Sequence, residues 1–241
     1  MMMVRSLIFA CALLAAVGDA AAEEAPCARE RAAMIEAIRA QAKSAIGRSP
    51  SEPVLAAIEQ TPRHLFMPES ACNSAYANRA ASIGHGQTIS QPFVVALMTD
   101  LAAVEPDHTV LEVGTGLGYQ AAILARLARR VCTLEIIAAL AESAAKRLKD
   151  LGHDNVSVRT GDGYRGWPDC GPFDAIVVTA ALGHVPPPLI EQLAVGGRLI
   201  MPLGSPSATQ ELTVVEKIAP GQTTTRAVAL VRFVPFTGPG K

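Results

Sequence analysis

The stretch VLEVGTGLGYQAA, residues 110–122, decides the fold class of this chain. A short apolar run ends in a glycine-rich turn, and the turn opens directly into a second apolar segment. Glycines at positions 114, 116 and 118 permit a tight turn and let a ligand approach the backbone closely. The pattern therefore predicts a strand, a glycine loop and a helix, the beginning of a βαβ unit.

Strand and helix patterns alternate on both sides of this unit. Helices are predicted over 93–104, 118–130, 137–151 and 186–194, and strands over 109–113, 131–136, 155–160, 173–181 and 197–204. Such alternation predicts an α/β fold with a doubly wound, Rossmann-like and mostly parallel sheet. Two stretches of alternating polarity, 210–218 and 224–236, predict an antiparallel hairpin at the C-terminus.

The residues before this core predict a helical extension. Apolar residues recur every four positions from Met34 to Ile46 and indicate a helix that ends at Gly47. A second helical pattern begins at Ser51, and 68–91 is predicted to be mostly loop. We expect 23–92 to hold the N-terminal helices and a substrate loop, and 93–241 to form the core of the same structural domain.

The first 22 residues resemble a secretory signal peptide. A basic residue, Arg5, precedes an apolar run over 7–17, and small residues over 20–22 form a cleavage site. The apolar run is shorter than the roughly 20 residues that a bilayer core requires. We therefore expect an exported, periplasmic protein without stable membrane association after cleavage, or a cytoplasmic one if the signal is not used. The alternatives are an uncleaved anchor and a lipoprotein signal at Cys11, which lies before most of the apolar run.

Charge and cysteine content limit the partners. The chain has 21 basic and 22 acidic residues, so it lacks the excess of positive charge that nucleic-acid binding favours. In an oxidising compartment, the most plausible disulfide joins Cys27 and Cys72, both in the N-terminal segment. Cys132 lies in an apolar strand and is expected to be a core thiol. Because the sequence has no Cys/His cluster, no metal is predicted.

Three carboxylates follow the predicted strands at one edge of the sheet. Glu135 ends the strand after the glycine loop, where an acidic side chain can accept hydrogen bonds from both ribose hydroxyls. Asp162 ends the next strand and can accept from an adenine amino group, while Glu112 precedes the first glycine and can face a cationic amino group. For each residue alone, the alternative is a solvated loop carboxylate or a helix cap. A further carboxylate, Asp174, is expected to orient the glycine loop at most.

The glycine spacing favours a nucleoside ligand without a pyrophosphate. A dinucleotide-binding G-x-G-x-x-G pattern would need a third glycine at position 119, which is Tyr119 here. An NAD-dependent oxidoreductase is therefore disfavoured. The loop also lacks the Lys-Ser/Thr pair of a P-loop. A cationic sulfonium nucleoside, S-adenosylmethionine, fits the carboxylates best and is the inferred cofactor.

The remaining motifs make the chain recognisable. The segments IGHGQTISQP (83–92), GDGYRGWP (161–168) and VRFVPFTG (231–238), together with the glycine loop, resemble protein-L-isoaspartate O-methyltransferases over roughly residues 55–238. The resemblance implies a class I methyltransferase that acts on isoaspartyl-containing proteins and peptides. Its reaction is methyl transfer from S-adenosylmethionine to the α-carboxylate of L-isoaspartyl residues, and more weakly to D-aspartyl side chains, as a step of protein repair.

The resemblance also assigns roles to residues. Ser90 matches the active-site serine of the family, and Thr237 matches a threonine near the substrate side. The implied cofactor-binding set comprises Thr88, Ile89, Ser90, Gln91, Glu112, Gly114, Thr115, Gly116, Gly118, Glu135, Asp162, Gly163 and Thr237.

The residue types suit this chemistry without the resemblance. A carboxylate is ionised at neutral pH, so it needs orientation rather than a strong general base. The hydroxyl of Ser90 can orient one carboxylate oxygen, although a serine before Pro92 can also cap a helix. His85 is interpreted as a loop histidine, and Tyr164 and Trp167 as residues that cover the adenine side or pack locally.

Two other functions stay open. One is a class I methyltransferase for a small-molecule acceptor, against which the segment around Ser90 argues. The other is a non-catalytic binding protein that keeps the fold. We expect a monomer.

Overall fold

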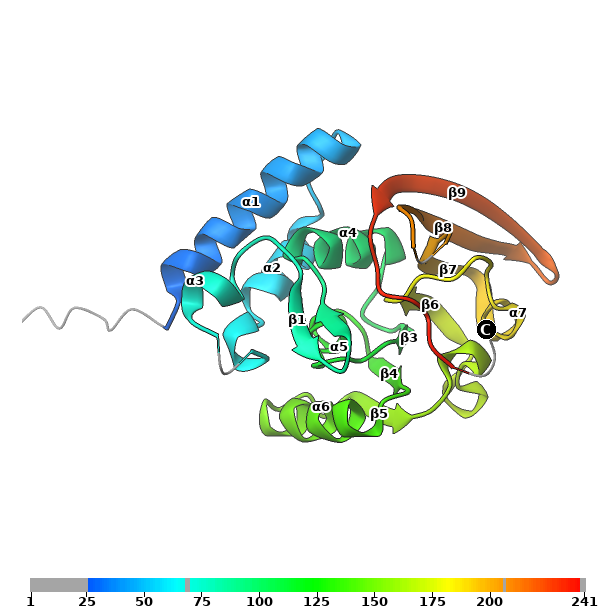
Figure 1. Ribbon diagram of the computed structural model, residues 1–241. Coiled ribbons are helices and arrows are strands. Elements are labelled where there is room, and N and C mark those ends of the chain that lie inside the picture. Colours follow the sequence, from blue (N-terminus) through cyan, green and yellow to red (C-terminus); the bar gives the residue numbers. More distant parts are fainter. Residues whose placement is uncertain (1–25, 68–69, 206, 239–241) are drawn as a thin grey trace, which may run out of the picture.

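The computed structural model describes residues 26–67, 70–205 and 207–238. The expected signal peptide over 1–22, with Cys11, lies outside the described residues. Figure 1 shows a central sheet with helices packed against it, the N-terminal helices at one end and a long β-hairpin at the other.

Within the described residues, seven strands form the central sheet in the order β5-β4-β3-β6-β7-β8-β9. The strands are β3 Thr109–Val113, β4 Arg130–Glu135, β5 Val156–Thr160, β6 Phe173–Val178, β7 Leu193–Leu203, β8 Gln210–Ala219 and β9 Gln222–Val231. The five strands β5, β4, β3, β6 and β7 pair in parallel with their neighbours. Strand β8 pairs antiparallel with β7, and β9 pairs antiparallel with β8. The predicted parallel sheet and C-terminal hairpin are confirmed.

Helices precede or connect the parallel strands as the hydrophobic pattern predicts. They are α4 Pro92–Ala102, α5 Tyr119–Ala125, α6 Ala138–Asp150 and α7 Pro187–Gln192. The helix predicted over 118–130 ends early, at Ala125. The side-chain amide of Asn155 donates to the carbonyl oxygens of Ala125 and Ala128, at 2.8 and 3.1 Å, and so stabilises the turn that leads into β4. A tertiary contact therefore overrides the local helical preference.

The N-terminal segment packs against the same core. Its helices are α1 Ala28–Ile46, α2 Glu52–Glu59 and α3 Cys72–Ala75, with a 3₁₀ turn, η1, over Arg63–Leu65. As predicted, Gly47 terminates α1: it follows the last helical residue, Ile46, and adopts a φ of +76°. Met34, Ile38 and Ile58 are buried in one apolar cluster with residues of α4 and α5.

The segment 68–91 contains more regular structure than predicted. Strands β1 Ala81–Gly84 and β2 Gln87–Ile89 pair in an antiparallel hairpin. Its turn places Gly84, His85 and Gly86 at φ values of +84°, +53° and +70°. Glycines on both sides make this tight turn accessible, and His85 is exposed at its tip.

The cysteine prediction was partly wrong. Cys27 and Cys72 form the expected disulfide, with Cα atoms 5.4 Å apart. Cys132 is not a free core thiol, because it forms a second disulfide with Cys170, with Cα atoms 6.7 Å apart. The two residues are 38 positions apart in the sequence; Cys132 lies in β4 and Cys170 in the short turn Pro168–Cys170, and tertiary packing brings them together.

The chain leaves the sheet after β9 and returns to the carboxyl ends of the parallel strands (Figure 1). The amide of Ala181 donates to the carbonyl of Val234, and the amide of Phe236 donates to the carbonyl of Ala181, both at 2.9 Å. We call residues 232–238 the C-terminal strap. Four of its residues, Val234 to Thr237, lie at the edge of the sheet next to the glycine loop.

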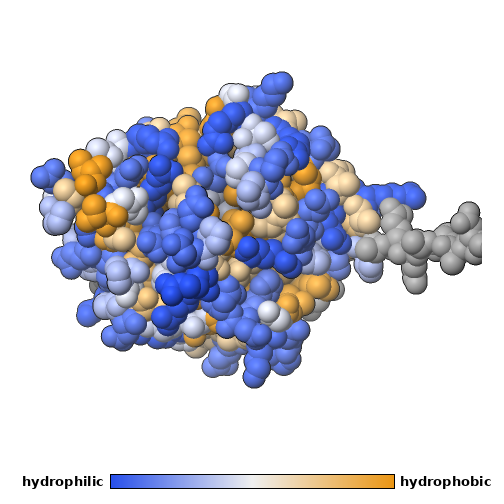
Figure 2. Space-filling model, turned by 180° about the vertical axis from the view of Figure 1, so that it is seen from behind, coloured by the Kyte–Doolittle hydropathy of each residue, from blue (hydrophilic) through white to orange (hydrophobic). Residues whose placement is uncertain are grey.

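The face shown in Figure 2 is mostly hydrophilic, with hydrophobic groups in separate small areas. None of the helices in the described part of the chain is long and apolar enough to cross a membrane.

Candidate active site

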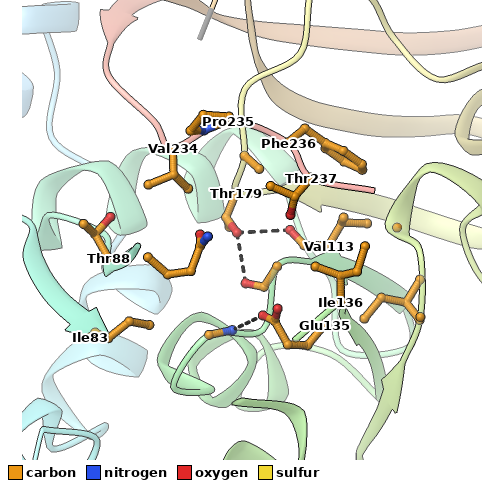
Figure 3. A pocket seen from close by; sticks show the side chains of 17 residues that line it. Ile83, Thr88, Val113, Glu135, Ile136, Thr179, Val234, Pro235, Phe236 and Thr237 are labelled. Atoms are coloured by element: carbon orange, nitrogen blue, oxygen red, sulfur yellow. Dashed lines mark hydrogen bonds between the residues drawn. The ribbon is translucent and has the colours of Figure 1, made fainter. Parts of the chain in front are cut away.

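The parallel strands β3, β4 and β6 end at one edge of the sheet, and a cavity opens there (Figure 3). The glycine loop and Glu135 line one side of it, the hairpin β1–β2 another, and the C-terminal strap the third. Its lining comprises Ile83, Gln87, Thr88, Val113, Gly114, Gly116, Leu134, Glu135, Ile136, Gly161, Gly163, Thr179, Ala180, Val234, Pro235, Phe236 and Thr237.

The glycine loop fits closely between its neighbours. Gly114 has a φ of +98°, and a Cβ there would clash with Oγ1 of Thr179. The Thr179 hydroxyl lies 3.0 and 2.9 Å from the carbonyl oxygens of Val113 and Gly114. Gly118, by contrast, starts α5 and faces Leu148, so it does not line the cavity.

Glu135 holds the same loop. Its Oε2 accepts a hydrogen bond from the Gly116 amide at 2.8 Å, and its Oε1 accepts from the Ile137 amide at 3.0 Å. Figure 3 shows its side chain at the base of the cavity, opposite the strap residues. Position and hydrogen bonding thus agree with the predicted placement at the edge of the sheet.

Asp162 lies beside the cavity rather than in its wall. Its Oδ1 accepts from the Tyr164 amide at 3.0 Å and caps the short turn η2, Gly163–Arg165. The flanking Gly161 and Gly163 do line the cavity. A Cβ at Gly163 would clash with the side chain of Val113, so the close approach of these backbones requires glycine.

A second, smaller cavity adjoins the first. It is lined by Thr88, Ile89, Ser90, Val95, Glu112, Gly114, Thr115, Gly116, Leu117, Tyr119, Gln120 and Thr179. Four of these residues also line the larger cavity, namely Thr88, Gly114, Gly116 and Thr179. Ser90, the predicted active-site serine, and the carboxylate Glu112 therefore line the same cavity. This cavity adjoins the larger one, which Glu135 lines.

Glu112 is fully buried in this site. Its Oε2 accepts a hydrogen bond from the hydroxyl of Thr133, while Oε1 has no partner among the described residues. Burial raises the pKa of the Glu112 carboxyl to about 8; the Thr133 hydrogen bond opposes this rise, and the negative charge of Glu135 adds to it. Thr115, whose hydroxyl lies 2.6 Å from that of Thr133, belongs to the same buried network.

Some predicted residues lie elsewhere. The side-chain amide of Gln91 donates to Oε1 of Gln41 and to the carbonyl of Asn78, both at 2.9 Å, and lines neither cavity. Asp174 does not orient the glycine loop, because its Oδ2 accepts from the Thr109 amide at the opposite end of β3.

The two aromatic residues after Asp162 pack locally. The Tyr164 hydroxyl lies 3.0 Å from Nε2 of His184, and the Arg159 guanidinium lies 4.5 Å from the centre of the Trp167 ring. Neither aromatic side chain lines the larger cavity.

Sequence reasoning missed Thr179, Tyr119 as a wall residue, and the strap residues Val234 to Phe236. Thr179 had a detectable signal, because it directly follows β6 and therefore lies at the same carboxyl edge. The strap was signalled only through the family resemblance of VRFVPFTG (231–238), which singled out Thr237. The placement of Val234 to Phe236 in the wall depends on the return of the chain after the β8–β9 hairpin.

The arrangement suits an uncharged or cationic nucleoside. No lysine or arginine occurs among the described residues that line either cavity, whereas two carboxylates do. Within the described ranges, no group of three or more His, Cys, Asp or Glu side chains is placed to hold a metal ion.

Comparisons with known proteins agree with this architecture. A protein-L-isoaspartate O-methyltransferase 2 from Syntrophobacter fumaroxidans is 53% identical over 229 residues, which cover 93% of each chain. A solved protein-L-isoaspartate O-methyltransferase has a TM-score of 0.77 at 27% identity, and the match covers 87% of this chain and 66% of that one. A solved structure from Plasmodium falciparum, described as a protein-L-isoaspartate O-methyltransferase in complex with S-adenosyl-L-homocysteine, has a TM-score of 0.72 at 24% identity. The match covers 85% of this chain and 97% of that one, and it supports the fold alone.

The model of one family matches most of the chain, from residue 30 to residue 241. The matched range includes the glycine loop, the Ser90 segment and the strap, which together form the two cavities. The chain therefore belongs to the protein-L-isoaspartate(D-aspartate) O-methyltransferase family.

Proposed function

We propose that this protein transfers a methyl group from S-adenosylmethionine to the α-carboxylate of L-isoaspartyl residues in damaged proteins and peptides. The observation that carries the proposal is the junction of the two cavities at Thr88, Gly114, Gly116 and Thr179. One space has the carboxylate and backbone groups that suit a nucleoside, and the adjoining space has Ser90. A methyl donor held across the junction can present its methyl group toward Ser90.

The residues present fit this cofactor. We assign the ribose hydroxyls to Glu135 and the adenine to Gly161, Gly163 and the turn at Asp162. The ammonium group of the methionine portion is assigned to Oε1 of Glu112, because this buried oxygen lacks a partner among the described residues and a cation would supply one. Thr88, Ile89, Gly114, Thr115 and Gly116 contribute the wall between the two portions.

Three predicted residues take supporting roles in this proposal. Gly118 permits the turn into α5 against Leu148. Gln91 anchors the Ser90 segment to α1 through Gln41. Thr237 lies in the strap that covers the larger cavity and is assigned to its outer rim.

The cofactor supplies an electrophilic methyl group on a positively charged sulfur. The acceptor carboxylate is already ionised, so the protein has no proton to remove. In the proposal, the Ser90 hydroxyl donates a hydrogen bond to one carboxylate oxygen and leaves the other free to form the new O–CH₃ bond. The S–CH₃ bond breaks, and its electron pair stays on sulfur. Alignment of this kind can contribute on the order of 7–11 kcal/mol.

The test is methyl transfer from labelled S-adenosylmethionine by residues 23–241. Matched peptides that contain L-isoaspartate or L-aspartate serve as acceptors, with Ser90→Ala and the control Ser82→Ala, an exposed serine of β1. We expect label on the isoaspartyl peptide alone, a roughly 10–100-fold lower kcat for Ser90→Ala, and no change for Ser82→Ala. Cofactor binding without transfer to either peptide would exclude this acceptor and favour a small-molecule acceptor.

We also propose that residues 1–22 direct export and that the mature enzyme is a periplasmic monomer. Two disulfides among the described residues support an oxidising location. An N-terminus at Glu23 in protein from the periplasmic fraction is the expected result. Retention of the intact chain in the cytoplasm would contradict export, and light scattering would measure the oligomeric state.

A further inference from the structure

Arg63 is a buried cation without an acidic partner. Only 1% of the residue is exposed, and none of the ion pairs found among the described residues includes it. Its hydrogen bonds go to main-chain oxygens instead: Nε donates to Ala75 at 2.9 Å, and Nη2 donates to Ser90 at 2.8 Å. Burial of an uncompensated charge is unfavourable and lowers the pKa of this guanidinium. Because burial of this charge is unfavourable, we expect Arg63 to have a role that requires a guanidinium at this position.

The same guanidinium also contacts Tyr119, a second residue that lines the smaller cavity. It lies 4.7 Å from the centre of the Tyr119 ring, within the range of a cation–π contact. Phe66 packs edge-on against that ring at 5.4 Å. Tyr119 is the first residue of α5, directly after the glycine loop, and lines the smaller cavity with Ser90. Arg63 therefore joins the Ser90 segment to the glycine-loop helix.

A nearby arginine shows what a purely structural bridge looks like. Arg126, at the end of α5, also links this helix to the N-terminal segment. Its Nε donates to Oγ1 of Thr61 at 2.9 Å, and its Nη2 donates to the carbonyl of Gln60 at 2.7 Å. Arg126 is exposed and lines neither cavity of the site. Attachment of the N-terminal segment to α5 thus does not require a buried charge at position 63.

We propose that Arg63 is a positioning residue for the methyl acceptor. It holds the Ser90 carbonyl, and thereby the peptide plane that follows Ser90, so that the hydroxyl faces the smaller cavity before the acceptor binds. The proposal rests on the role of Ser90 in the proposed function. The planar guanidinium suits two carbonyl groups and an aromatic face at once, whereas the compact ammonium of a lysine does not.

The experiment is a double-mutant cycle with Arg63→Met and Ser90→Ala. We expect Arg63→Met to lower kcat on an isoaspartyl peptide roughly 10–100-fold, because small misplacements of a reacting group are costly. The Kd for S-adenosylmethionine should stay within about threefold. If Arg63 acts through Ser90, the double variant should be no slower than Ser90→Ala alone. Arg126→Met is the matched control and should retain kcat.

Multiplicative effects of Arg63→Met and Ser90→Ala on kcat would overturn the proposal. A wild-type kcat for Ser90→Ala would also overturn the proposal. If Arg63→Met does not fold, Arg63→Lys replaces it. A folded Arg63→Lys protein with wild-type kcat and only a lower Tm would show a merely structural residue.

Amide hydrogen exchange of 87–91 tests the positioning without any acceptor. We expect faster exchange in the Arg63 variant than in Arg126→Met, and equal exchange would count against the proposal. This readout separates the two proposals: an enzyme inactive on isoaspartyl peptides would disprove the proposed acceptor, whereas unchanged exchange would disprove the role of Arg63.

Discussion

Thr133 donates its hydroxyl proton to Oε2 of Glu112, directly across from it in the parallel pair β3–β4, and leaves Oε1 without a partner among the described residues. This half-satisfied, buried carboxyl has a pKa of about 8, mainly because of burial. In the proposed function, it receives the ammonium group of the cofactor. We therefore expect this one group to influence both cofactor affinity and the stability of the fold.

Cofactor binding should depend on the ionisation of Glu112. A cation binds the ionised carboxylate, so affinity should rise as the pH rises toward 8, by at most about tenfold per pH unit. Glu112→Gln should bind S-adenosylmethionine roughly 10–100-fold more weakly and lose most of this pH dependence. Calorimetric titration between pH 6 and 9 measures both effects. The same pH slope in both proteins would rule out Glu112 as the titrating group.

Stability of the unliganded protein should have the opposite pH dependence. The folded state holds the Glu112 proton more tightly than the unfolded chain, where the ordinary pKa is 4.5. The resulting stabilisation is complete below about pH 4.5 and is lost as the pH rises through 8. We expect Tm to fall by about 5–10 °C more in the wild type than in Glu112→Gln between pH 6 and 9. Parallel Tm curves for the two proteins would contradict this assignment.

Substitution of Gly114 should weaken cofactor binding. A Cβ at this position would clash with Thr179, and the φ of +98° disfavours any side chain. Gly114→Ala should therefore lower the affinity for S-adenosylmethionine by at least about tenfold, with a loss of roughly 1–3 kcal/mol in unfolding free energy. Gly183→Ala is the matched control, because a Cβ there meets nothing within 4 Å. Normal binding by Gly114→Ala would show that the loop relaxes without consequence.

A protein that comprises residues 23–241 should have no free thiol. The four cysteines after residue 22 form two disulfides that span 45 and 38 residues. By loop closure alone, each is expected to stabilise the folded state by about 4 kcal/mol. Thiol titration in denaturant should detect none before reduction and four after it, and reduction should lower Tm. Free thiols in protein freshly purified without reductant would contradict this pairing, and Cys27→Ala/Cys72→Ala would separate the two contributions.

The amino-acid sequence alone is sufficient to predict the class of fold and the edge of the sheet that holds the site. Hydrophobic periodicity specifies strands and helices locally, and parallel strands must end at the same edge. For this reason the sequence pattern by itself places Glu112, Glu135 and the glycines together. It also places Asp162 at the correct edge, although the side chain of Asp162 caps a turn beside the cavity.

Only the tertiary structure decided which side chains complete the walls of the cavities. The strap residues, Thr179, and the bond from Arg63 to Ser90, 27 positions away, depend on packing between segments distant in sequence. The same holds for the Cys132–Cys170 disulfide, and for Gln91, whose amide bonds to Gln41 of α1 although the preceding Ser90 lines the smaller cavity. The local hydrophobic pattern determines whether each segment forms a helix, a strand or a loop. Side-chain partners are chosen only when the hydrophobic cores on both faces of the sheet close, because that step sets which segments meet.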